Sequence, residues 1–109
     1  MNEKYSKKQR RYLRDLAAEC HEFELEAAME ELYEQFQKWG GKGIDVFELN
    51  ERVHEFHNGI SRELYKRYVM MDPDFSVAYA LNNDILKKSA VDKEVLKLLE
   101  NMLIATKKC

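Results

Sequence analysis

The stretch SKKQRRYLRDLAAECHEFELEAAMEELYEQFQKWGG, residues 6–41, decides the fold of this 109-residue chain. No proline interrupts it and no glycine occurs before Gly40, so we expect one helix, capped by Ser6 and running to about Trp39. The glycines that follow should end it, because glycine readily adopts the left-handed conformation of a helix stop. At 1.5 Å per residue the helix would be roughly 50 Å long, whereas a domain of this size should have a radius of gyration of about 13 Å.

Two lines of apolar residues run along this predicted helix. The first consists of Leu13, Leu16, Cys20, Phe23 and Ala27, and the second of Leu25, Met29, Leu32, Phe36 and Trp39. Both lines have spacings of three and four, which is typical of an apolar helix face, but they are rotated relative to each other. One contact cannot cover both, so part of the helix should project or pack on a second chain.

Charge divides the same helix into two segments. Six cations fall within eleven residues, namely Lys4, Lys7, Lys8, Arg10, Arg11 and Arg14. Eight acids and no Lys or Arg follow between Asp15 and Gln37. Cations at a helix N-terminus oppose the helix dipole, so helix stability does not explain this pattern.

Three interpretations of the divided charge remain open. The charges can be solvated faces that contribute little, or the cations can form a basic arm for RNA or DNA, although the acids beside them would repel phosphate. The interpretation we favour is antiparallel pairing of two copies, basic end against acidic middle. It predicts a homodimer whose interface is formed by Leu13, Leu16, Cys20 and Phe23.

The remainder of the chain predicts shorter helices. Asp45 to Glu48 reads DVFE, a capping-box pattern, and should start a helix from Val46 to about His57. Its buried stripe would consist of Val46, Leu49, Val53 and Phe56. Asn58-Gly59 should break the chain before a third helix, capped by Ser61 and ending at Met70, that buries Leu64 and one or both of Tyr65 and Tyr68.

Two more helices are expected towards the C-terminus. Asp72-Pro73 should start one that stops at Asn82-Asn83, because proline suits the first helical position. Ser89 or Asp92 should cap the last one, whose apolar face would hold Val95, Leu98, Leu99, Met102 and Leu103. We therefore predict a single all-α domain, residues 1–109, in which a long N-terminal helix is followed by shorter helices packed as a small bundle.

Composition limits the classes of protein to consider. Hydrophobic residues make up 45% and charged residues 35%, and the net charge is −2, so no global field favours nucleic acid or membrane binding. The sequence contains neither the apolar run of a signal peptide nor one long enough to span a membrane. Its two cysteines, Cys20 and Cys109, are too few for a disulfide framework, and we expect a cytoplasmic protein.

The stretch ERVHEFHNG, residues 51–59, carries the main candidate for chemistry. Glu51 and His54 have the Glu-x-x-His spacing of di-iron helical bundles, and His54 with His57 could hold zinc. Glu51, His54 and His57 are therefore a candidate metal site. An ordinary polar helix face is the alternative, because Val53 and Phe56 would point inward.

Arg52 and His57 in the same stretch also resemble the Arg-x4-6-His motif of HEPN ribonucleases, which are small all-helical domains. The resemblance implies metal-independent RNA cleavage at a dimer interface, with Arg52 near the scissile phosphate and His57 as acid or base. The longer run FELNERVHEFHNGISRELYKRY is similar to small uncharacterised all-helical prokaryotic proteins and implies no activity.

The sequence thus favours a non-enzymatic homo-oligomeric interaction or assembly protein. No phosphate-binding loop, dinucleotide fingerprint or paired Cys-x-x-Cys is present in the sequence, and we expect no cofactor. The rival functions are an RNase centred on Arg52 and His57 and a metal protein centred on Glu51, His54 and His57.

Overall fold

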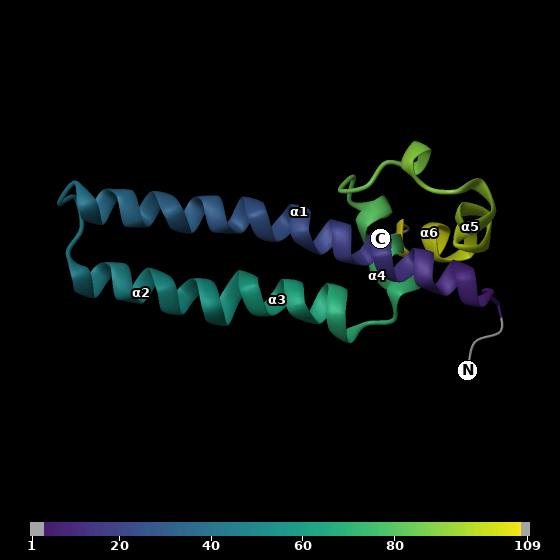
Figure 1. Ribbon diagram of the computed structural model, residues 1–109, viewed down its shortest axis with the longest axis horizontal. Coiled ribbons are helices and arrows are strands. Elements are labelled where there is room, and N and C mark those ends of the chain that lie inside the picture. The colour runs from purple at the N-terminus through teal and green to yellow at the C-terminus, as the bar shows by residue number, and fades with distance from the viewer. Residues whose placement is uncertain (1–3, 108–109) are drawn as a thin grey trace.

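The computed structural model describes residues 4–107, and these residues form helices and connecting turns (Figure 1). The helix α1 (Lys7–Gly40) runs nearly the whole length of the molecule. The molecule measures 54 × 24 × 24 Å and has a radius of gyration of 17.4 Å, well above the value for a sphere-like domain of this length. The predicted all-α class, with one long N-terminal helix and shorter helices packed against it, is confirmed.

The ends of α1 show which local signals set its length. The Ser6 hydroxyl accepts a hydrogen bond from the Gln9 N–H at 3.0 Å, and the Gln9 side chain accepts one from the Ser6 N–H at 2.9 Å. This reciprocal capping box confirms Ser6 as the start. At the other end the left-handed residue is Lys42, with φ 67°, whereas Gly41 has a φ of −90°. The turn therefore does not use glycine for the left-handed position that we expected.

A second long helical arm returns antiparallel to the distal half of α1. It consists of α2 (Val46–Phe56), a π-helical turn η1 (His57–Ser61), α3 (Arg62–Tyr65) and a second π-helical turn η2 (Lys66–Met70). Asp45 caps it as predicted, because its carboxylate accepts the Glu48 N–H at 2.8 Å. We call this arm together with residues 21–40 of α1 the hairpin (Figure 1).

The predicted break at Asn58-Gly59 is wrong. The chain passes through these residues as a π-helical turn, and Ser61 has helical dihedrals and makes no capping hydrogen bond. A glycine inside a helix costs only about 1 kcal/mol, which packing along α1 can offset. The π-turn also explains how the arm keeps contact with α1 on both sides of Gly59, because each π-turn shifts the helix face.

The remaining helices fold back onto the first half of α1 and form what we call the head. They are α4 (Pro73–Asn82), the 3-10 turn η3 (Lys88–Ala90), α5 (Lys93–Leu98) and α6 (Glu100–Lys107). The core of the molecule lies between the head, the first half of α1 and the end of the second arm. Its largest fully buried hydrophobic side chains are Leu13, Leu64, Val77, Val95 and Leu99, of which Leu64 comes from α3. The side chain of Ser76 connects the head to the hairpin by donating a hydrogen bond to the Arg67 carbonyl at 2.6 Å.

The last predicted helix is divided in two. Asp92 caps α5 by accepting from the N–H groups of Glu94 and Val95, whereas Ser89 lies within η3. The chain then turns at Leu99, whose side chain is buried, before α6 begins. The apolar spacing alone did not indicate this turn, because Val95, Leu99 and Leu103 keep a helical rhythm across it and all three are buried.

Gly59 provides a test of the continuous second arm. A Cβ atom added there would meet nothing within 4 Å, and its φ is not positive. We expect Gly59→Ala to raise the free energy of unfolding by about 1 kcal/mol in urea titrations, because alanine restricts the unfolded chain and favours helix.

Gly43→Ala is the matched control, because its Cβ would lie 3.3 Å from the Lys38 carbonyl oxygen and should bring no such gain. If Gly59→Ala instead destabilised the protein, the arm would need a real break at this residue.

Candidate interaction surface

A polar cluster joins the two arms of the hairpin at the end that adjoins the head. Glu24 of α1 accepts hydrogen bonds from the Arg67 guanidinium at 3.1 and 3.2 Å and from the Tyr68 hydroxyl. The Tyr68 ring stacks on His21, with centroids 5.7 Å apart, and the Arg67 guanidinium lies 4.2 Å from the centroid of the Tyr79 ring. We call Glu24, Arg67 and Tyr68 the clamp, since they connect α1 to η2, and Arg67 also contacts Tyr79 of α4. Sequence spacing gave no sign of it.

Burial keeps the titratable groups around the clamp protonated. It raises the pKa of Tyr68, and the hydrogen bond to Glu24 adds to this effect, so the phenol acts as a donor. Burial also raises the pKa of the Cys20 thiol to about 11, with smaller contributions from Glu19 and Glu24. A thiol with such a pKa is a weak nucleophile at neutral pH, so this cluster has the character of a structural joint.

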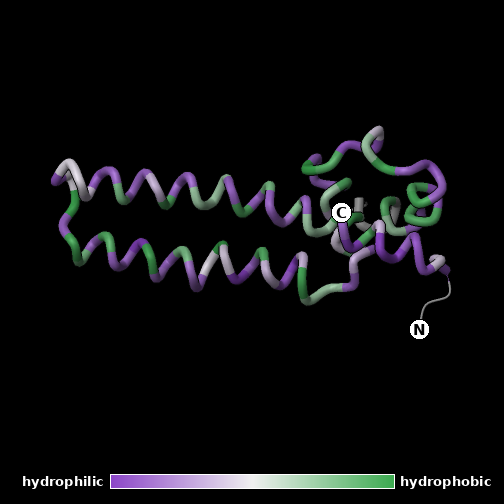
Figure 2. The backbone as a smooth tube through the Cα atoms, in the orientation of Figure 1, coloured by the Kyte–Doolittle hydropathy of each residue, from purple (hydrophilic) through white to green (hydrophobic). Residues whose placement is uncertain are grey.

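The hairpin exposes large apolar side chains beyond the clamp. Met29, Tyr33 and Phe36 lie on one face of α1, at spacings of four and three, and all three are exposed; we call them the arm stripe. Phe47, at the start of the second arm, has an exposed fraction of 78%. Figure 2 shows hydrophobic positions distributed along both arms of the hairpin. Only the second arm covers α1 here, so apolar side chains on the other side of α1 stay in contact with solvent.

A charged face accompanies the arm stripe along α1. Its members are exposed and follow each other at steps of three and four: Lys8, Arg11, Asp15, Glu19, Glu22, Glu26 and Glu30. The two cations lie over the head and the acids extend onto the hairpin. The divided charge of the sequence therefore becomes one continuous exposed face, with opposite signs at its two ends.

The predicted interface residues differ in their exposure within one chain, and the interface itself stays a prediction. Leu13, Leu16 and Cys20 are buried in the core of the head, because helices of the head cover this face of α1. Phe23 is different, with an exposed fraction of 62%. Three of the four residues expected at an interface between copies are thus used within the chain, and the uncovered apolar surface lies further along α1.

The residues of the candidate metal site are all exposed on the second arm. Glu51 and His54 belong to α2, and His57 begins η1. Among residues 4–107 no three His, Cys, Asp or Glu side chains are grouped so that they could hold a metal ion. The three side chains therefore do not form a metal site within this chain.

The pair that resembles the ribonuclease motif lies on the same arm. Arg52 forms ion pairs with Glu48 at 3.0 Å and Glu55 at 3.3 Å, both on its own helix. His57 is exposed and five residues away, which places it about 140° round an α-helix from Arg52. One chain therefore does not bring Arg52 and His57 together, and RNA cleavage between two chains stays a prediction.

Comparison with known proteins gives no relative from which a function could be inferred. No protein-family model, no curated protein and no solved structure matches this chain. In the part of the chain that the structure describes, no helix combines the length and the hydrophobicity needed to cross a membrane.

The clamp predicts a large effect of a single substitution. Glu24→Ala leaves the partly buried Arg67 cation without its carboxylate and should lower the free energy of unfolding by about 3 kcal/mol. Tyr68→Phe should lower the free energy of unfolding by about 1 to 2 kcal/mol. The double variant Glu24→Ala/Tyr68→Phe should lose less than the sum of the two single losses, because Arg67 and Tyr68 share the Glu24 carboxylate. Urea unfolding measures all three. The control Glu26→Ala removes an exposed acid, and an equal loss there would show that the clamp has no special role.

Cys20 predicts a loss of stability at alkaline pH. Its thiol has a pKa of about 11 in the folded chain and about 8.5 when unfolded, so the folded state retains a proton that the unfolded state releases. Stability is therefore complete below about pH 8.5 and falls by at most about 1.4 kcal/mol per pH unit above it. Comparing Cys109→Ser with Cys109→Ser/Cys20→Ala by urea unfolding at several pH values isolates this thiol. Parallel pH dependences in the two proteins would contradict the assignment.

Proposed function

We propose that this chain is a non-enzymatic assembly protein that forms a homodimer through its hairpin. The observation that carries the proposal is the arm stripe, three large apolar side chains exposed along a helix that projects from the head. Contiguous apolar surface of this kind on a projecting element is typical of protein–protein contact.

The size of the hairpin fits a second copy. The first arm has 20 residues and the second has 25, so the overlap of the two arms is about 30 Å long. Two packed helices are about 20 Å wide, which gives a face of roughly 600 Å². A stable interface buries about 800 Å² per partner, so the hairpin face with a margin of the head is sufficient. Two hairpins pack naturally as a four-helix bundle, which covers both exposed stripes at once.

Charge favours an antiparallel arrangement of the two hairpins. In a parallel pair the acids Glu22, Glu26 and Glu30 of one copy would face the same acids of the other. An antiparallel pair centred on the arm stripe instead brings Glu22 and Glu26 of each copy towards the tip of its partner's hairpin, which carries Lys38 and Lys42. Exposed ion pairs contribute about 0 to 1 kcal/mol each, so they set orientation while the arm stripe supplies affinity.

If the arm stripe forms the dimer interface, a negative charge introduced there should dissociate the dimer. Tyr33→Glu and Phe36→Glu should each shift the protein from dimer to monomer in sedimentation equilibrium at micromolar concentration, because burying an unpaired carboxylate outweighs the apolar gain. The matched control is Met70→Glu, which alters an exposed apolar residue of η2 and should leave the dimer intact. A monomeric mass for the unmodified chain would refute the proposal, and added salt should weaken the dimer only modestly.

A further inference from the structure

Cations cover the side of the first turns of α1 that faces away from the head. We call them the basic face: Lys7, Lys8, Arg10, Arg11 and Arg14. Leu13 and Leu16 of the same helix are buried against the head, and at about 100° per residue the basic face spreads over roughly 160° of the opposite side. Arg10 is half-buried and the other four cations are exposed. Residues 7–14 contain no acid, and hydrophilic positions predominate in the first turns of α1 (Figure 2).

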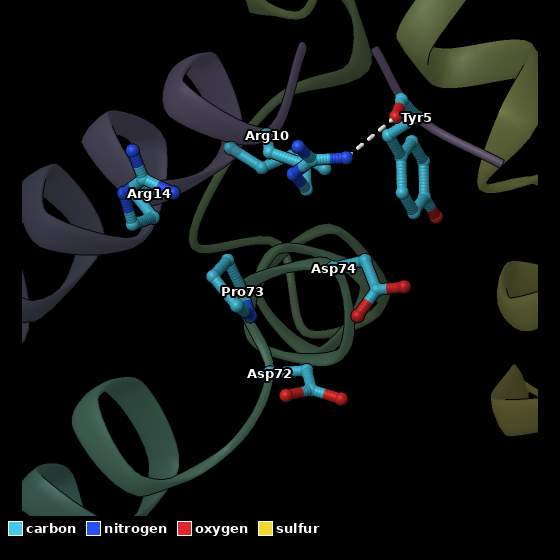
Figure 3. Close-up of a pocket in the computed structure, with 7 residues that line it drawn as sticks. Tyr5, Arg10, Arg14, Asp72, Pro73 and Asp74 are labelled. Carbon is cyan, nitrogen blue, oxygen red and sulfur yellow. Dashed lines mark hydrogen bonds between the residues drawn. The ribbon is translucent and has the colours of Figure 1, made fainter. Parts of the chain in front are cut away.

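The charge of the basic face is not neutralised within the described part of the chain, where none of its five side chains forms an ion pair. Arg10 donates one hydrogen bond, to the Tyr5 carbonyl at 3.0 Å (Figure 3). Asp72 lines the same cavity as Arg10 and Arg14 without pairing with either, and Asp74 beside it is paired with the Tyr5 hydroxyl. The basic face is therefore open to an external anion.

The basic face also destabilises the helix that carries it. Arg11 lies four residues from Lys7 and three from Arg14, and like charges at these spacings repel each other on a helix. All five cations also lie close to the N-terminus of α1, where the helix dipole disfavours positive charge. No contact within the chain offsets this repulsion, whereas a bound polyanion would.

The net charge of −2 conceals a separation of charge along the molecule. Residues 4–20 and 71–107, at the head end, contain 11 Lys and Arg against 8 Asp and Glu. The hairpin, residues 21–70, contains 6 Lys and Arg against 11 Asp and Glu. A polyanion is thus attracted to the head and repelled by the hairpin, which leaves the hairpin free for the proposed dimer.

We propose that the basic face binds the phosphate backbone of double-stranded DNA, with the first two turns of α1 in the major groove. This groove is about 12 Å wide and admits an α-helix. Lys8 and Arg10 lie on opposite edges of the basic face, so they reach the phosphates of both strands. Three of the five cations are arginines, whose guanidinium groups bind phosphate through two hydrogen bonds. Asp15 and Glu19 follow on the exposed side of α1 and end the contact after these turns.

Other polyanions fit the basic face less well. Proteins that bind single strands stack bases on aromatic rings, but Tyr5 is buried and the Tyr12 hydroxyl accepts the Asp92 N–H at 2.8 Å, so both rings of this segment are used by the head. The major groove of duplex RNA is too narrow for side chains to read. A helix that lies on a membrane inserts large apolar side chains, and no such side chain stands between these cations.

The test is fluorescence anisotropy of a labelled DNA duplex of about 20 base pairs, two helical turns, titrated with the full-length protein at several salt concentrations. We expect a dissociation constant between about 1 and 100 µM at physiological salt, as for sequence-independent binding. Five phosphate contacts displace counterions, so the logarithm of the binding constant should fall with the logarithm of the salt concentration at a slope of about −4 to −5.

Competing ligands decide between the polyanions. Single-stranded DNA and duplex RNA of the same length should bind at least about tenfold more weakly than duplex DNA. Equal or tighter binding of either would overturn the proposal, as would sedimentation with vesicles of anionic phospholipid in the absence of DNA binding. No binding of duplex DNA at about 100 µM protein and about 50 mM salt would also overturn it.

Arg11→Gln and Arg14→Gln identify the surface. Each removes one phosphate contact, so each should weaken binding several-fold and bring the salt slope closer to zero by about 1. The melting temperature of the free protein should stay unchanged or rise, because repulsion between like charges is relieved. The matched control Arg62→Gln removes an exposed arginine of the hairpin and should change neither affinity nor slope. An equal loss in Arg62→Gln would show that net charge alone governs binding and would overturn the proposal.

Discussion

The length of α1 is the constraint on which the rest of the structure depends. Its 34 residues form one helix without a break, and the chain has too few remaining residues to surround it. The head covers the first half with α4, α5 and α6, which completes a core around Leu13 and Leu16. Only one antiparallel arm is left for the second half. A two-helix hairpin cannot bury both sides of either helix, so its outer apolar residues stay exposed.

The clamp lies near the boundary between the half of α1 that the head covers and the half that only the second arm covers. Glu24 is on the part of α1 where the head ends and the hairpin begins, and its partners Arg67 and Tyr68 are at the matching end of the second arm. Here side chains are partly buried, so an ion pair is screened less than on the surface and loses less hydration than in a core. The clamp holds the two arms together where they adjoin the head, and the contact of Arg67 with Tyr79 extends it to α4.

Local signals in the sequence located most helix starts, but they did not show which helices pack on each other. Ser6, Asp45 and Pro73 mark the starts of helices in the structure as they do in the sequence, because capping depends on a few adjacent residues. The line Leu13, Leu16 and Cys20 was recognisable as a buried face, but spacing cannot tell whether the same chain or another one covers it. The break expected at Asn58-Gly59 failed because packing along α1 outweighs a weak local preference. Glu24 and Arg67 are 43 residues apart, so no sequence pattern joined them.

Hydrogen exchange of the arms at two protein concentrations tests the central claim most directly, that the head is complete within one chain and the hairpin is completed by a second copy. Exchange is measured by mass spectrometry at about 1 µM and about 100 µM, which spans the expected dissociation range. The account predicts that amides in residues 25–37 and 46–60 become more protected at the higher concentration, while those in residues 13–20 do not change. Protection of the hairpin that is the same at both concentrations, or a change confined to residues 13–20, would contradict it.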